Sequence, residues 1–142
     1  MLFDVAHSDL GVVTGIAPAA AVTDNTPFVS TILDMQGKLG AEFVFVTGTN
    51  ADADATATVL VEESATSNMA GSNAVADDDL LGTELLAGFT FADDGEPRKI
   101  GYRGAKRYIR VTITPANNTG NQFLAGLWLF KDDNGPEPNP PV

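Results

Sequence analysis

Basic side chains are concentrated in one short segment of this chain. The segment, residues 98–110, reads RKIGYRGAKRYIR, holds six of the eight lysines and arginines and contains no acid. It therefore carries +6, whereas the rest of the chain, with two bases and nineteen acids, carries −17. The six basic residues are candidate interface residues: Arg98, Lys99, Arg103, Lys106, Arg107 and Arg110.

Two kinds of charge pairing fit such a segment. Cations that cross a protein interface set the register and orientation of the partners, which here would be acidic copies of the same chain or another acidic protein. A symmetric oligomer would bring the basic segment of one subunit against carboxylates of the next. Alternatively, the six cations pair with carboxylates of their own sheet, and each exposed pair then contributes only ~0.2–1 kcal/mol. The sequence leaves both interpretations open.

Groups that could do catalysis are scarce. The single histidine, His7, lies in an N-terminal segment without sustained periodicity, so a general base would have to be held by an irregular chain end. Nothing in the sequence fixes two carboxylates at the separation that glycoside hydrolysis needs. We therefore expect no enzymatic activity and no cofactor.

Clustered carboxylates raise the question of calcium, a cation that prefers oxygen ligands. None of the clusters fits the twelve-residue loop with a closing glutamate that defines an EF-hand. The sequence therefore favours ordinary acidic turns over a metal site. The clusters are Asp77–Asp79, then Asp93, Asp94 and Glu96, and then Asp132, Asp133 and Asn134.

Length and composition suit a single domain. A chain of 142 residues buries roughly 70% of its unfolded surface, and this one contains no cysteine. Its net charge of −11 and pI near 4.1 repel phosphate backbones, which argues against a nucleic-acid partner. Asp4 and Asp9 stand where a secretory signal places bases, and the apolar run 123–130 is too short for a membrane helix. We expect neither a signal peptide nor a membrane partner.

Turn residues divide the middle of the chain into short runs that alternate as β-strands do. About seven such strands, with one helical turn near Asp77, predict an all-β fold: an antiparallel β-sandwich, jelly-roll-like, over residues 26–131. The two simplest connections are hairpins, one joining 41–49 to 55–64 and the other joining 97–104 to 105–115.

The two ends of the chain read differently. Residues 1–25 mix glycine, alanine, proline, aspartate and threonine without a sustained period, so we expect an extended N-terminal arm. Residues 132–142 form a Pro-rich segment with four prolines in the last seven positions, and we expect a flexible tail there.

The run QFLAGLWLF near the C-terminus is apolar on both faces of a strand. Phe123 and Leu127 alternate with Trp128 and Phe130. Such a strand is either central in a sandwich or exposes one face to a partner chain. We take Trp128 and Phe130 as candidate interface residues on the second interpretation.

Six segments occur in a fixed order along the chain: TILDMQG, AEFVFVTG, TVLVEES, AVADDDLLGTE, KIGYRGAKRYIRVTITP and LAGLWLF. Together they resemble a family of small tailed-bacteriophage structural proteins, over about residues 31–130, and the fifth segment is the most specific. Met35 stands where the family often has leucine, and the Pro-rich tail is a further departure.

This resemblance implies a head decoration, or cement, protein. Such a protein is a β-sandwich that forms homotrimers, binds the major capsid protein on the outer surface of the capsid and stabilises contacts between capsomers. On this hypothesis the strand 123–130 joins the copies, while the arm 1–25 and the basic segment hold the shell. The expected location is the virion.

The alternative is a receptor- or carbohydrate-binding β-sandwich module of the virion. It would use Trp128, Tyr102 and Tyr108 as flat platforms on which a sugar ring stacks. Because Trp128 lies on a strand that reads as core, the sequence favours decoration over sugar binding.

Overall fold

The computed structural model describes residues 2–133, 136–138 and 140. Strands dominate the described chain, with two short α-helices and one turn of 3-10 helix. In chain order the elements are α1 (Leu2–Asp9), β1 (Gly11–Ile16), β2 (Phe28–Val29), β3 (Leu33–Asp34), β4 (Lys38–Asn50), β5 (Thr56–Ser64), β6 (Asn73–Ala74), η1 (Asp77–Asp79), β7 (Leu80–Leu81), α2 (Glu84–Ala87), β8 (Phe89–Thr90), β9 (Pro97–Tyr102), β10 (Tyr108–Ala116) and β11 (Gln122–Asp132).

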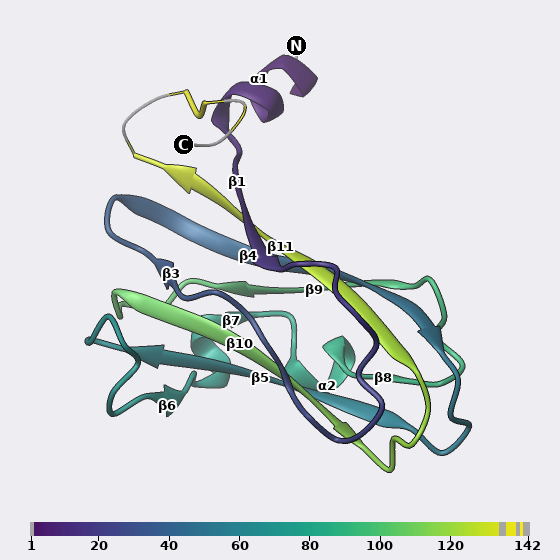
Figure 1. The fold of residues 1–142 in the computed structure, drawn as a ribbon. Coiled ribbons are helices and arrows are strands. Elements are labelled where there is room, and N and C mark those ends of the chain that lie inside the picture. The colour runs from purple at the N-terminus through teal and green to yellow at the C-terminus, as the bar shows by residue number, and fades with distance from the viewer. Residues whose placement is uncertain (1, 134–135, 139, 141–142) are drawn as a thin grey trace.

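The strands form two antiparallel sheets that lie face to face (Figure 1). We call them sheet A and sheet B. Sheet A has the strand order β1-β11-β4-β9-β7, and sheet B has the order β2-β10-β5-β6, with β3 also on β10 and β8 also on β5. This arrangement confirms the predicted all-β sandwich.

Alternate residues of each long strand fill the space between the sheets. On β4 the inward side chains are Phe43 and Phe45, and both are fully buried. The ring of Phe43 meets the ring of Trp128 edge to face, with centroids 4.8 Å apart. Trp128 also donates its indole N–H to the carbonyl oxygen of Thr31, at 3.2 Å, so its one polar group is satisfied. Sheet B contributes Val111 and its neighbours on β10 to the same core.

Both predicted hairpins are wrong. β4 lies in sheet A and pairs with β11 and β9, whereas β5 lies in sheet B and pairs with β10. β9 and β10 are likewise split between the two sheets. An alternating strand can bury its apolar face against a neighbouring layer as well as beside a hairpin partner, and both apolar faces here meet across the core. The segment 97–116 is therefore an arch between the sheets.

Residues 11–16 differ from the expected N-terminal arm, because they form strand β1 at the edge of sheet A. Two glycines explain why this strand lacks a plain alternation. A side chain on Gly11 would overlap the ring of Phe130, and one on Gly15 would overlap the ring of Phe43. These glycines admit the large rings of neighbouring strands, so they are signs of close packing.

The connection after β1 crosses from sheet A to sheet B (Figure 1). It is tied on its way by an isolated bridge between Val22 and Gln122, whose backbone groups exchange two hydrogen bonds. Strand β11 reaches Asp132, one residue into the expected tail. The remainder of that tail includes residues outside the described ranges, so its flexibility stays a prediction.

Candidate interaction surface

The structure distributes the basic segment over three places. Lys99 and Arg98 lie on β9 in sheet A, and Arg110 lies on β10 in sheet B. Arg103, together with the remaining two cations, belongs to the turn between these strands. The six charges that are adjacent in sequence do not form one face.

Three of the arginines are already paired with carboxylates of the same chain. Each pair joins residues that are distant in sequence or lie across a turn, with N···O separations of 2.8–3.0 Å. The interpretation of internal pairing is therefore correct for half of the segment. The pairs are Arg98 with Asp93, Arg107 with Asp34, and Arg110 with Glu62.

The other three cations of the segment form no ion pair with the residues that the structure describes. Arg103 donates from Nε and Nη2 to the carbonyl oxygen of Asp78, at 3.1 and 2.9 Å. Within the described ranges Lys99 and Lys106 form no ion pair. The turn itself is fixed, because the hydroxyl of Tyr102 accepts from the Lys106 N–H and donates to Glu63.

The Arg110–Glu62 pair predicts a pH-dependent contribution to stability. Burial raises the pKa of Glu62, but hydrogen bonds from Arg110 and Ser72 outweigh burial and hold that pKa below its ordinary value. A depressed folded-state pKa stabilises the fold above the unfolded pKa and loses that contribution as the pH falls through the folded value. Replacing Arg110 by methionine should therefore cost about 1–3 kcal/mol at pH 7 and much less near pH 3.

Urea denaturation at the two pH values measures this difference. Arg107→Met is the matched control, because it breaks the more exposed Arg107–Asp34 pair and should cost under about 1 kcal/mol at pH 7. A cost for Arg110→Met that is equal at both pH values would show that Glu62 is not the group concerned.

Trp128 and Phe130 are not interface residues. They point into the sandwich and expose 1% and 8% of their surface, respectively. Their side of β11 faces the core because Gly126 and Leu124, in the same alternation, are buried as well. The other side of the strand remains uncovered, with Phe123 39% and Leu127 44% exposed.

That uncovered side belongs to a larger apolar surface, the outer face of sheet A. Its residues form rows across the sheet, because the register places outward positions of neighbouring strands opposite each other. The first row is Val12, Leu129, Glu42, Gly101 and Leu81, the second is Thr14, Leu127, Val44 and Lys99, and the third is Ala125, Val46 and Pro97.

Shallow apolar depressions lie at both ends of this face. One, of about 380 Å³, is lined by Leu10, Leu39, Leu81 and Leu129 among others. The second, of about 160 Å³, lies between Phe123 and the connection after β1. Monomeric soluble proteins seldom leave so continuous an apolar surface uncovered, so this face has the character of an interaction site.

Two charged side chains interrupt the apolar face. Glu42 and Lys99 lie on adjacent strands, offset by one row. Burial raises the pKa of Glu42, and the nearby Lys99 ammonium opposes that rise. Its three rows thus carry one acid and one base, and the net charge of the rows is zero. Two further cations border them: Lys131, at the next outward position of β11, is paired with Asp9, and Arg103 lines the depression beside Leu81.

Sequence reasoning placed Lys99 among the interface candidates and took the strand 123–130 as the joining surface, but it named residues of the buried side of that strand and missed β1 and β4. The signal was present, since AEFVFVTG, like QFLAGLWLF, is apolar at successive positions and so has no polar side for water. What the sequence did not provide was the assignment of faces. Of the eight candidates, Lys99 alone lies in a row of the outer face.

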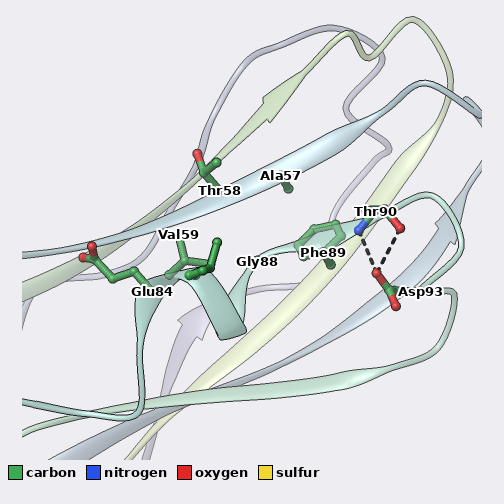
Figure 2. A pocket seen from close by; sticks show the side chains of 9 residues that line it. Ala57, Thr58, Val59, Glu84, Gly88, Phe89, Thr90 and Asp93 are labelled. Atoms are coloured by element: carbon green, nitrogen blue, oxygen red, sulfur yellow. Dashed lines mark hydrogen bonds between the residues drawn. The ribbon is translucent and has the colours of Figure 1, made fainter.

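An open groove lies beside α2, where the helix packs against β5 (Figure 2). Its volume is about 480 Å³, and Ala57, Val59 and Phe89 form its apolar part. The carboxylates at its rim have internal partners. Glu84 accepts from the Val61 N–H at 2.7 Å. Asp93 accepts from the backbone and hydroxyl of Thr90.

Metal-ligating side chains do not cluster in the part of the chain that the structure describes. No three histidine, cysteine or acidic side chains of that part of the chain converge on a point where they could hold an ion. Asn134 lies outside the described residues. His7 is exposed on α1, which lies beyond one end of the sandwich (Figure 1). In the same part of the chain, no helix has the length and apolarity to cross a bilayer.

Two of the three aromatic rings considered for stacking against a sugar are buried. Tyr102 and Trp128 each expose 1% of their surface. Burial and the hydrogen bond to Glu63 raise the pKa of the Tyr102 hydroxyl, as expected of a phenol built into the core. Tyr108 is partly exposed, but the guanidinium of Arg107 lies 5.1 Å from its ring centre.

Comparisons with known proteins give matches to solved structures. No family model matches the chain, and neither does any curated protein sequence. Three similar structures are the CBM22-1–GH10 modules of Clostridium thermocellum xylanase 10B, the CBM35 of Cellvibrio japonicus Abf62 and the C-terminal CBM6 of LamC, a laminarinase from Zobellia galactanivorans.

The similarity to these structures is distant. Sequence identities are 12%, 9% and 6%, and TM-scores are 0.43, 0.43 and 0.44. The matches cover 90%, 84% and 89% of this chain, and 27%, 92% and 95% of the other chains. The chain thus spans about a quarter of the xylanase structure.

Proposed function

We propose that this chain is a structural β-sandwich of a tailed-bacteriophage virion, a head decoration protein that acts by binding rather than by catalysis. The observation that carries the proposal is the uncovered apolar outer face of sheet A, with Leu127 at its centre and Val46 beside it. A surface of this kind is stable in water once another protein surface covers it.

The resemblance of residues 31–130 to small tailed-phage structural proteins supports the same function. Its most specific segment, KIGYRGAKRYIRVTITP, forms the arch that joins sheet A to sheet B. The arch is held by Tyr102, Arg103 and Arg107 through bonds to Glu63, Asp78 and Asp34. The resemblance therefore falls on residues that fix the scaffold carrying the apolar face.

The physical benefit of decoration follows from mass action. A protein that binds the assembled shell and not its separated parts stabilises the shell by its binding free energy. Copies linked in an oligomer bind more tightly than single ones, because the second contact is intramolecular. Weak individual contacts are sufficient when the copies are numerous. The partner in this proposal is the major capsid protein on the outer surface of the capsid.

Retention on heads tests the proposal. The purified chain is mixed with undecorated heads assembled from the major capsid protein of the same genome, and bound chain is measured after sedimentation. We expect saturable binding and an increased melting temperature of the heads. Leu127→Asp should reduce binding at least about tenfold, because a charge at that position must be desolvated in the apolar contact, whether the shell covers the face directly or a second copy covers it and links two chains on the shell.

The control is Leu60→Asp, at a leucine of comparable exposure on the other sheet. This variant should bind like the wild type. If the wild-type chain does not bind heads, the decoration proposal fails. An equal loss of head binding for both variants would show that head binding does not depend on the outer face of sheet A.

A carbohydrate-binding module is the second candidate, and the groove beside α2 favours it. Its apolar floor and its rim of Thr58, Thr90, Glu84 and Asp93 are the kinds of group that bind sugars. Both carboxylates already have protein partners, so a sugar would have to compete for them. Retention of the chain on host-surface glycans, with no retention on heads, would favour this candidate.

A further inference from the structure

We infer that the outer face of sheet A is covered by the same face of a second copy of this chain, with Glu42 of each copy opposite Lys99 of the other. This inference deepens the proposed function, on which its biological meaning rests. The occupant follows from the charges and the apolar rows of the face.

Charge complementarity favours a second copy over another partner. The face holds one acid and one base, so a partner that is uniformly acidic or basic would leave one of them unpaired in an apolar contact. A copy of the same face offers the opposite set. In an isologous interface residue i meets residue j and residue j meets residue i, and Glu42 with Lys99 satisfies that rule.

The positions of the two side chains are compatible with a two-fold axis. Glu42 lies opposite Gly101, and Lys99 lies opposite Val44, so the two are one strand and one row apart. A two-fold axis that runs in the plane between the two stacked sheets and passes midway between Glu42 and Lys99 brings Glu42 of each copy against Lys99 of the other. The Glu42 carboxylate lies over Gly101, beside Leu81, in the space that a side chain at position 101 would need.

The rest of the surface disfavours other modes of self-association. The chain carries −11 overall, so copies repel one another where carboxylates dominate. The outer face of sheet A is neutral and apolar, so repulsion is small there and burial is favourable. Its side chains extend over all five strands of sheet A, and stacked sheets interlock at a spacing of about 10 Å.

Two charge reversals and their mixture test the inference without heads. E42K gives the face two bases, and K99E gives it two acids. Each variant alone should self-associate at least about tenfold more weakly than the wild type, because like charges then meet in the interface. An equimolar mixture should recover association as a heterodimer. Sedimentation velocity measures all three samples and the wild type.

Recovery in the mixture distinguishes contact between copies from a pair within one chain. If Glu42 and Lys99 paired within one chain, both reversals would have to be in the same molecule to restore the pair. Mixing the two single variants cannot achieve this. K106E is the matched control, since Lys106 lies in the turn and not on the face, and it forms no ion pair with the residues that the structure describes. It should associate like the wild type. Val46→Lys, at a more exposed position of the same face, should also weaken self-association, and it tests the face independently if E42K does not fold.

Several results would overturn the inference. They are a wild-type chain that stays at its monomer mass of 14.8 kDa at high concentration, a mass three times that value, or a mixture that stays monomeric. Dissociation by K106E alone would assign the contact to the basic turn. Head binding by a monomeric chain would refute the two-fold pairing but agree with the decoration proposal. Self-association without head binding would support the pairing and refute decoration.

Discussion

Replacing Trp128 by alanine is expected to remove about 3–5 kcal/mol from the free energy of unfolding, whereas the same change at Leu127 should remove less than about 1 kcal/mol. The two residues are neighbours on β11 and differ in the face they occupy. Trp128 loses its edge contact with Phe43 and its hydrogen bond to Thr31. Leu127 is 44% exposed and loses little in a single chain.

Urea denaturation at protein concentrations too low for self-association measures both values. The comparison tests directly which face of β11 is turned toward the core, because the two positions are adjacent on the same strand and pair with the same neighbouring strands. Equal losses would mean that both faces are buried in one chain. A larger loss for Leu127→Ala would reverse the assignment of faces and remove the basis of the proposed interface.

Replacing Gly15 by alanine should destabilise the fold by about 1–3 kcal/mol. The new methyl group would overlap the ring of Phe43, which is fully buried and cannot move without disturbing Trp128. In an extended arm the same substitution would be neutral, or it would stabilise the fold by reducing the conformational entropy of the unfolded chain. The sign of the change therefore distinguishes a strand of the sandwich from an arm.

A double-mutant cycle with Phe43→Ala identifies the cause. If the ring is what the methyl group meets, Gly15→Ala should cost clearly less in the Phe43→Ala background, with an interaction energy above about 0.5 kcal/mol. Gly71→Ala is not a suitable control, because Gly71 has φ +65 and any side chain there is strained. Gly40, with φ outside that region and no close neighbour, is suitable.

The fold class was predictable because it depends on patterns that the sequence displays directly. Short runs with alternating apolar residues, such as TATVLVEE, indicate strands, and the turns between them are marked by glycine, asparagine and aspartate. Strand pairing was not predictable in the same way. Whether β4 and β5 lie side by side or across the core depends on which other strands occupy their edges, and β11 is far away in sequence.

The interface candidates show the same limit of sequence reasoning. Six cations within thirteen residues read as one patch, but an arch between sheets sends their side chains to different surfaces. The apolar strand 123–130 was recognised, yet alternation cannot tell which half of it faces inward. Gly126 marks the inward half, since the ring of Phe43 and the Cβ of Phe45 fill the space that a side chain there would need.

The position of β11 also determines which contacts must form before sheet A is complete. This strand follows all the others in the chain order, yet it lies between β1 and β4 in sheet A, and its pairing Gly11↔Phe130 joins the first strand to the last. Without β11, β1 has no partner in the sheet and one edge of β4 is unpaired, so completion of sheet A depends on contacts of large sequence separation. The apolar rows of its outer face therefore cannot form before this long-range pairing, which should make folding slow for a domain of this size.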